Sequence, residues 1–350
     1  MNKLISLEEV SNALNLSRDV VIDIVKNKNI AIFNIGEEEF ISESEAADIF
    51  VEKIENNNEE IIEKESGRYD SRNKLNDLTG KEWMPETKSF WYQKGLGKSH
   101  PHAQIEKQHP APFSFQDISR LIAFFTKKGE VVLDPFSGVG STVKAAALTE
   151  RKGIGIELSP KWSELSLKRL EIEVGEGTSK HHKIITGDSR KVLKKLEKNS
   201  VDFVVTSPPY WAILNKKADH KVKKERLEND LATNYSDSDD DLGNVQEYSD
   251  FLNIMTDDIF LETGKIIKPQ KYMAIIVSDF RHKSKFISFH SDLIQRLDNL
   301  NLGDGFELTL QGVKVLLQNH KSLLPYGYPF AYVENIHHQY ILIFRKTKVV

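Results

Sequence analysis

The stretch VVLDPFSGVGST, residues 131–142, places a short apolar run before an Asp-Pro-Phe turn and two glycines. The apolar run, rich in β-branched residues, is typical of a buried parallel strand. Asp134 ends this run, and Gly138 and Gly140 precede an alanine-rich segment that is expected to be helical. In α/β proteins, a strand, a glycine turn and a helix bring backbone close to a ligand at the carboxyl edge of the sheet. The stretch therefore predicts an α/β fold with a ligand pocket at this turn.

The glycine turn differs from two well-known nucleotide-binding loops. Val143 stands where the dinucleotide fingerprint has its third glycine, and no Gly-Lys-Ser/Thr follows at the spacing of a phosphate-binding loop. Two acids extend the pattern, because Glu157 closes the apolar run 153–157 and Asp188 closes the run 184–188. A carboxylate at the first position can accept both hydroxyls of a ribose, and one at the second can accept from the amine of an adenine. Together they indicate a pocket for a ligand that contains adenosine.

The chain beyond residue 81 alternates between strand-like and helix-like segments. This rhythm predicts a doubly wound, mostly parallel sheet of the Rossmann-like class. Expected strands lie at 129–134, 152–158, 182–188, 201–206, 272–279, 306–317 and 337–346, and expected helices at 141–150, 160–171, 189–198 and 288–297, with a further helix ending near residue 267.

Residues 1–55 are expected to form a small helical accessory domain. Ser6 with Glu9 and Ser42 with Glu45 make capping-box patterns, Ser17 is placed to cap a second helix, and residues 30–41 are typical of a hairpin. This order resembles a winged helix-turn-helix module, although a domain that only packs or dimerises would look similar. Residues 56–80 are polar and are expected to be a linker. The catalytic domain is then expected at 81–350.

The composition bounds the class of protein. The chain has 350 residues, of which 39% are hydrophobic and 29% charged, and it has no cysteine. The absence of cysteine excludes disulfides, zinc-thiolate sites and a catalytic thiol, and it fits a cytoplasmic protein. No metal site is expected. No apolar run approaches a membrane span. Because the net charge is −4, nucleic-acid binding would have to use local basic patches.

The run VDFVVT, residues 201–206, ends in Ser207-Pro208-Pro209-Tyr210. Two prolines cannot extend a hydrogen-bonded ladder, and they stiffen the corner that follows the strand. The Ser207 hydroxyl and the Pro208 carbonyl are acceptors at this stiff corner, and Tyr210 adds an aromatic ring. Trp211 is expected to belong to the core.

These motifs together resemble the amino-methylating DNA methyltransferases, which modify N4 of cytosine or N6 of adenine. The resemblance covers roughly residues 81–346, and the Asp-Pro-Phe turn paired with Ser-Pro-Pro-Tyr is its most specific part. It implies S-adenosylmethionine as cofactor and double-stranded DNA as substrate. The Ser207 hydroxyl and the Pro208 carbonyl would then hold the two hydrogens of an exocyclic base amine, and Tyr210 would stack on a base turned out of the duplex. By motif, the expected catalytic residues are Ser207, Pro208, Pro209 and Tyr210, and the expected cofactor-binding residues are His109, Phe113, Asp134, Phe136, Gly138, Gly140, Ser141, Thr142, Glu157 and Asp188.

The region of this family that recognises the target sequence varies in position between its groups. Here it is expected in the 212–247 insertion, in residues 281–335 or in the N-terminal module. The insertion has a basic run followed by an acidic one, and such runs are usually solvated. As a loop that contacts DNA, it would use Lys216, Lys217, Lys221, Lys223, Lys224 and Arg226.

Serine before the two prolines is usual in the cytosine enzymes of this family, whereas adenine enzymes usually have Asp or Asn. Ser207 therefore favours N4 of cytosine, with N6 of adenine as the alternative. The resemblance also implies a role in a restriction-modification or defence system, with a cognate restriction endonuclease as partner. Two other functions stay open: a DNA-binding regulator on an inactive methyltransferase scaffold, and methylation of RNA or a small molecule.

Overall fold

A computed structural model describes residues 4–14, 17–36, 38–47, 49, 61–64, 67–93, 100–106, 108–109, 113–211, 240–319 and 321–349. The chain forms two compact units, Met1–Lys88 and Ser89–Val350, and each is described by itself. None of the helices in the described ranges has the length and the apolar character needed to cross a bilayer.

The first unit begins with a small antiparallel sheet and two helices. Strands β1 (Leu4–Ser6), β3 (Glu38–Ser42) and β2 (Phe33–Ile35) pair in that order, and helices α1 (Leu7–Leu14) and α2 (Arg18–Asn27) lie between β1 and β2 in the chain. The expected hairpin is therefore present as β2 and β3. Both capping boxes form, because the backbone N–H groups of Glu9 and Glu45 donate to the Ser6 and Ser42 hydroxyls. The winged helix-turn-helix assignment stays a prediction.

Residues 56–80, which were expected to be a linker, include regular structure. Strands β4 (Ile61–Lys64) and β5 (Gly67–Asp70) pair as an antiparallel hairpin. Thr79 then caps α4 (Gly80–Glu86) with a capping box in which Glu82 is the partner. The polar composition of this stretch hid the hairpin, because short two-stranded ribbons need few apolar residues.

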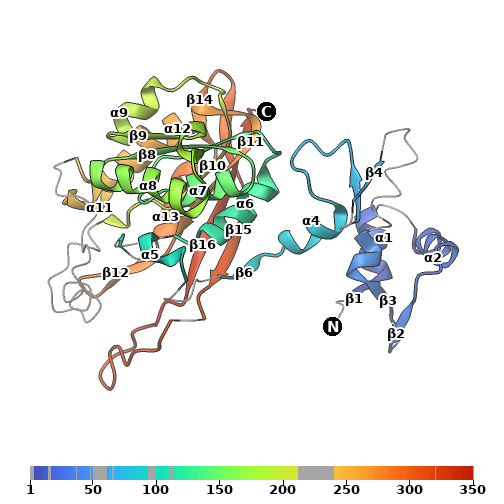
Figure 1. Cartoon of the computed structure of the whole chain (residues 1–350). Helices are drawn as coiled ribbons and strands as arrows, with labels where there is room; N and C mark the ends of the chain where they lie inside the picture. Colours follow the sequence, from blue (N-terminus) through green and yellow to red (C-terminus); the bar gives the residue numbers. More distant parts are fainter. Residues whose placement is uncertain are drawn as a thin grey trace. The chain divides into compact units, whose positions relative to one another are not determined.

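The second unit is built on a nine-stranded sheet, shown in Figure 1. The strand order along the sheet is β14-β15-β16-β11-β10-β7-β8-β9, and β6 pairs in parallel with β15. The strands are β6 (Phe90–Tyr92), β7 (Val131–Asp134), β8 (Lys152–Glu157), β9 (Lys183–Thr186), β10 (Val201–Thr206), β11 (Ile267–Val277), β14 (Leu300–Gly303), β15 (Phe306–Leu317) and β16 (His338–Lys348).

Five neighbouring strands, from β11 to β9, run parallel, and β16 runs antiparallel to β11 and β15. This arrangement confirms the expected α/β class with a mostly parallel sheet. The carboxyl ends of β7, β8, β9 and β10 consequently meet at one edge of the sheet. The motif residues that follow these strands therefore lie at this edge of the sheet.

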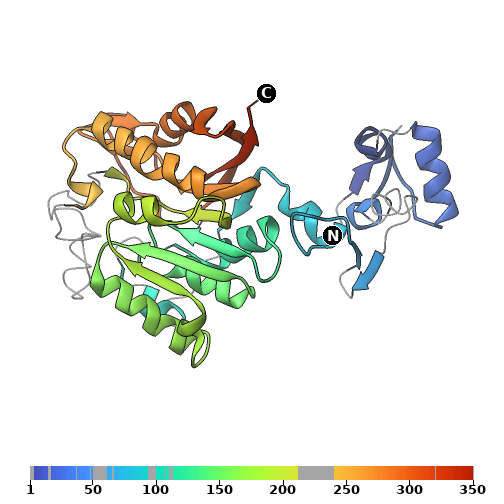
Figure 2. The ribbon, with the colours of Figure 1, turned by 90° about the horizontal axis from the view of Figure 1, so that it is seen from above.

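Helices cover both faces of this sheet (Figure 2). Helix α6 (Phe115–Phe125) packs on one face, where the Phe125 ring stacks on Phe203 with centroids 5.0 Å apart. Val204 points to the opposite face and shares a buried cluster with Phe251 and Phe260. The helices on the α6 side include α7 (Ser141–Leu148) and α8 (Pro160–Glu173); the other side has α11 (Tyr248–Asn253), the π-helical segment Ile254–Phe260, α12 (Leu261–Ile266) and α13 (Phe289–Leu297).

Most expected elements of this unit are present within a few residues. The helix expected at 189–198 is shorter, because α9 (Ser189–Val192) changes to a 3-10 turn at Leu193. A hairpin of β12 (Phe280–His282) and β13 (Lys285–Ile287) follows β11 and was not expected. Trp211 is buried in the core as predicted, and its indole N–H donates to the Val245 carbonyl at 2.7 Å.

Candidate active site

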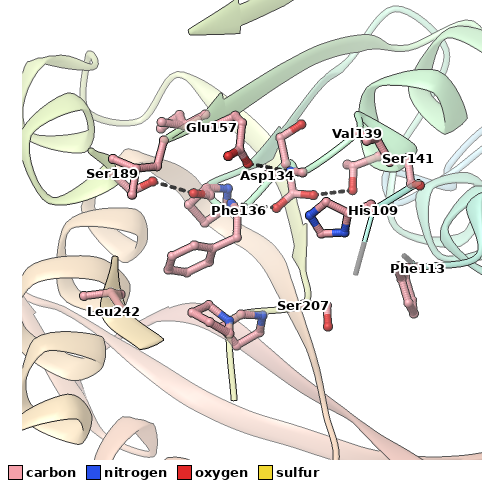
Figure 3. Close-up of a pocket in the computed structure, with 18 of the residues that line it drawn as sticks. His109, Phe113, Asp134, Phe136, Val139, Ser141, Glu157, Ser189, Ser207 and Leu242 are labelled. Carbon is pink, nitrogen blue, oxygen red and sulfur yellow. Dashed lines mark hydrogen bonds between the residues drawn. The ribbon is translucent and has the colours of Figure 1, made fainter. Parts of the chain in front are cut away.

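A pocket lies at the carboxyl edge of the parallel strands (Figure 3). Residues from all the expected motifs line it, together with several residues that the sequence did not single out. The expected residues in its wall are His109, Phe113, Asp134, Phe136, Gly138, Ser141, Thr142, Glu157, Asp188, Ser207, Pro208, Pro209 and Tyr210. Gly140, the remaining residue expected to bind the cofactor, is absent from this wall and shapes the turn behind it.

Asp134, at the end of β7, holds the glycine turn in place. One carboxylate oxygen accepts from the Phe136 N–H at 2.9 Å and the Thr206 hydroxyl at 2.6 Å, and the other accepts from the Thr142 hydroxyl at 2.6 Å. Burial raises the pKa of Asp134, although these three donors favour its ionised form. The carboxylate thus links β7, β10 and the start of α7, and its expected role toward the cofactor stays a prediction.

The two glycines of the turn are needed for close contacts with different neighbours. Gly138 has φ +50°, and a Cβ there would lie 3.2 Å from the His109 ring, so its small size keeps the turn close to that imidazole. Gly140 has φ +73°, and a Cβ there would lie 2.9 Å from Ser166 on α8. Both positions combine a left-handed backbone with close packing, which only glycine accepts without strain.

Glu157, at the end of β8, faces the pocket, and two backbone N–H groups orient its carboxylate. One oxygen accepts from the Gly138 N–H and the other from the Ser159 N–H, both at 2.8 Å. Each oxygen keeps a lone pair for a further donor. Burial raises the pKa of Glu157 to about 7, because removal from water disfavours the charged form.

This pKa makes ligand binding at Glu157 sensitive to pH. Below about pH 7 the free carboxyl is mostly protonated and accepts fewer hydrogen bonds, so binding that needs the carboxylate weakens as the pH falls. We expect the affinity for 5′-methylthioadenosine, which has no ionising amino acid group, to increase roughly tenfold from about pH 6 to about pH 8. Calorimetric titration measures this change. The Glu157→Gln variant should bind weakly with no such slope, and a flat profile for the unaltered protein would contradict the assignment.

Asp188 lies after β9 and is partly occupied by a neighbouring arginine. Its carboxylate accepts from the backbone N–H of Arg190 at 2.9 Å and from the guanidinium at 3.0 Å. Burial alone would raise the pKa of Asp188, but the bonds and charge of Arg190 outweigh it and lower the pKa. Arg190 also bonds Asp240 at 2.9 Å. Asp188 therefore stays charged at the pocket wall, and its expected role toward an adenine stays a prediction.

Gln339, a residue of β16, helps to fix the corner that follows β10. The Gln339 side-chain amide donates to the Tyr210 hydroxyl at 2.9 Å. The Ser207 hydroxyl and the Ser278 backbone also hydrogen-bond this phenol, and burial raises its pKa, so it stays neutral at ordinary pH. The edge of Tyr210 packs against the Phe289 ring with centroids 6.1 Å apart. These contacts fix the aromatic ring in the pocket wall beside Ser207.

A buried ionic cluster anchors the segment that carries His109. Arg169 on α8 is fully buried and bonds Glu173 at 2.9 Å and Glu106, at the end of α5 (Ala103–Glu106), at 2.7 Å. Lys144 completes the cluster with a 2.5 Å contact to Glu173. Three residues after Glu106, the His109 ring meets the Trp162 ring edge to face, with centroids 5.1 Å apart. The cluster fixes α5, and α5 places His109 over the glycine turn.

Several residues of the pocket wall had no signal in the sequence. They are Asp240, Asp241, Leu242, Ile259 and Gln339. Asp240 and Asp241 end the acidic run of the insertion, which composition alone marks as solvated, and Leu242 follows them. Gln339 is separated from Tyr210 by 129 residues, so only the pairing of β16 with β11 reveals that they meet.

The six basic residues expected to contact DNA lie outside the described residues. These are Lys216, Lys217, Lys221, Lys223, Lys224 and Arg226. Their assignment stays a prediction.

A family model described as DNA methylase matches residues 10–168. The matched stretch contains the Asp134 turn and Glu157, both of which line the pocket. The match covers slightly less than half of the chain. This match, together with the relatives below, confirms the earlier resemblance to the amino-methylating DNA methyltransferases.

Curated relatives match this chain over short stretches. The Type II methyltransferase M.BglI of Bacillus subtilis is 37% identical over 97 residues, which are 27% of this chain and 26% of the relative. The orphan methyltransferase M.BamHII of Bacillus amyloliquefaciens is 37% identical over 79 residues, 22% of this chain and 30% of the relative. The matches thus span about a quarter to a third of these relatives. Among solved structures, TrmN from Thermus thermophilus has 17% identity and a TM-score of 0.39, covering 73% of this chain and 54% of that one.

Proposed function

We propose that this methylase transfers a methyl group from S-adenosylmethionine to the exocyclic amine of a base in double-stranded DNA. The observation that carries the proposal is that one pocket is lined both by Glu157 with the glycine turn and by the Ser207–Tyr210 corner. The first set suits an adenosine and the second suits a planar base with an amine. A transfer reaction requires the two ligands to meet, and a shared pocket provides that proximity.

The residues present fit S-adenosylmethionine. Glu157 offers acceptors for ribose hydroxyls, and Phe136, Ile156 and Leu158 offer apolar surface for a flat ring. The Ser137 hydroxyl lines the same pocket and, within the described part of the chain, is buried without a hydrogen-bond partner. Such a group is expected to gain a partner when a ligand is present. When bound, the cofactor supplies an electrophilic methyl group.

The protein's own part in the reaction is to hold the amine and the base. An exocyclic amine is a poor nucleophile, because its lone pair is delocalised into the ring. The Ser207 hydroxyl and the Pro208 carbonyl, on a corner stiffened by two prolines, accept its two hydrogens and favour a tetrahedral nitrogen. Tyr210, fixed by Gln339 and Ser278, stacks on the base once it has left the duplex.

Within this reaction we propose N4 of cytosine as the methylated atom. Ser207 supports this assignment, because the cytosine enzymes of the family usually have serine before the two prolines. The Ser207 hydroxyl can donate to N3 of cytosine while accepting from the amine. Adenine also has an acceptor, N1, beside its amine, so hydrogen bonding separates the two bases weakly. N6 of adenine is the alternative, and a role in restriction-modification with a cognate endonuclease is part of the same proposal.

Transfer of a tritiated methyl group tests the proposal against its competitors. The purified chain is incubated with labelled S-adenosylmethionine and, in parallel, with unmethylated genomic DNA, ribosomal RNA or free nucleosides. We expect label in DNA alone. Label in RNA or nucleosides instead would assign another acceptor. DNA binding with no label in any acceptor would support the inactive regulator.

A further inference from the structure

A loop of exposed aromatic rings joins β15 to β16. We call residues 321–336 the aromatic loop; Figure 1 shows it as a long red-brown arm that extends beyond the sheet. Phe330 is 93% exposed, Tyr332 82% and Tyr328 81%. No charged residue occurs between Ser322 and Val333. Large apolar groups gathered on a protein surface usually mark an interaction site.

Hydrogen bonds within the aromatic loop give its backbone a defined conformation. Its neck is closed by Asn335, whose side-chain oxygen accepts from the Leu324 N–H at 3.0 Å and whose amide donates to the Leu324 carbonyl at 2.8 Å. At its tip, the Gly327 carbonyl accepts from the N–H groups of Phe330 and Ala331, both at 2.7 Å. Gly327 has φ +74°, and a Cβ there would lie 2.2 Å from the Ala331 carbonyl oxygen. The rings are therefore displayed by a defined turn.

The root of the loop adjoins the catalytic corner. Strand β16 is antiparallel to β11, with Tyr340 opposite Val277, so the loop leaves from the carboxyl edge of the sheet. Gln339, next to Tyr340, lines the pocket and bonds the Tyr210 hydroxyl at 2.9 Å. The loop is thus continuous with the wall that we assign to the target base.

A basic turn leaves the same edge from the neighbouring strand. The β12–β13 hairpin follows β11 directly, and Lys283 and Lys285 at its turn are exposed, with no ion pair among the described residues. Asp279, the acid closest to it in the chain, is buried and held by His290 at 2.8 Å. The hairpin therefore presents two lysines, unpaired among the described residues, beside the root of the aromatic loop.

We propose that the aromatic loop enters the base stack of the duplex beside the pocket, while Lys283 and Lys285 hold the adjoining phosphates. This inference rests on the proposed function in taking DNA as the substrate. Uncharged rings two residues apart match the faces of bases, and inserted apolar side chains can unstack a duplex step. The charge needed for the phosphates comes from the neighbouring hairpin. A protein partner seated on the loop would instead obstruct the edge through which a base must enter.

Binding as a function of salt separates the two contributions. The probe is a fluorescent pool of sheared, unmethylated genomic duplexes, and the full chain is used throughout. We expect Phe330→Ser with Tyr332→Ser to weaken binding by at least about tenfold, with an unchanged slope of log affinity against log salt. Lys283→Gln with Lys285→Gln should lower that slope by about two units. Ile172→Ser, an exposed apolar residue on α8, is the matched control and should change neither quantity.

The outcomes separate this inference from the proposed function. If the ring variant binds DNA and transfers methyl groups as the unaltered chain does, the inference is overturned while the methyltransferase assignment stands. If binding depends on the rings but no label reaches DNA, the inference stands and the proposed function fails. A ring variant that changes the sedimentation coefficient without changing DNA affinity would show that the loop joins two copies of the chain, which also overturns the inference.

Discussion

Replacing Tyr210 by alanine is expected to remove most methyl transfer while S-adenosylmethionine affinity stays unchanged. The ring lies in the pocket wall beside Ser207, and Gln339 fixes it there. Stacking of a base on an aromatic ring contributes roughly 1–3 kcal/mol, which corresponds to a loss of about five- to 150-fold in kcat/KM. Tritium transfer to DNA and calorimetry with the cofactor measure the two quantities.

The Tyr210→Phe variant separates the ring from its hydroxyl. It keeps the stacking surface but leaves the Gln339 amide and the Ser278 N–H without their acceptor. We expect turnover between those of the unaltered chain and Tyr210→Ala. Equal turnover in all three would show that Tyr210 only fills the core, and loss of cofactor affinity in Tyr210→Ala would show that the corner belongs to the cofactor site.

Replacing Arg169 by leucine is expected to lower the free energy of unfolding by about 3–5 kcal/mol. Arg169 is fully buried and bonds both Glu106 and Glu173, so its loss leaves Lys144 as the sole cation of the cluster beside two carboxylates. An uncompensated buried charge lowers the free energy of unfolding far more than the loss of a surface ion pair does. Urea unfolding at neutral pH, followed by tryptophan fluorescence, measures the change.

The matched control is Lys194→Leu, which breaks an exposed ion pair with Asp258. Surface pairs of this kind contribute at most about 1 kcal/mol. A loss at Arg169 no larger than that at Lys194 would show that the cluster does not stabilise the fold. Because α5 joins this cluster to His109, weakened cofactor binding is also expected in any folded Arg169→Leu protein.

Local patterns predicted the elements that form the pocket. The apolar runs before Asp134, Glu157 and Ser207 are strands that end at one edge, as parallel order requires. Asp134, Glu157 and Ser207 therefore reach the pocket from their own strands, whereas His109 and Phe113 were expected only from the family resemblance. The glycine turn was predictable for the same reason, since its conformation depends on a few adjacent residues.

Contacts between distant segments were not predictable. The Arg190 guanidinium donates to the Asp188 carboxylate, which the sequence pattern assigned to a ligand. Arg190 also donates to Asp240, 50 residues away. Gln339 reaches Tyr210 because β16 is inserted antiparallel beside β11, and no local property of either strand encodes that position. The short strands β12, β13 and β14 carry too few apolar residues to show a period of two.

Mass spectrometry of nucleosides tests the central claim most directly. DNA is isolated from cells that express the chain and from cells that carry the empty vector, digested to nucleosides and compared. The account predicts N4-methylcytosine in the first sample at a level absent from the second. N6-methyladenine in its place would overturn the assignment of cytosine and leave the methyl transfer to a base amine standing. Neither modified base, in cells where the folded protein is abundant and binds S-adenosylmethionine, would contradict the account.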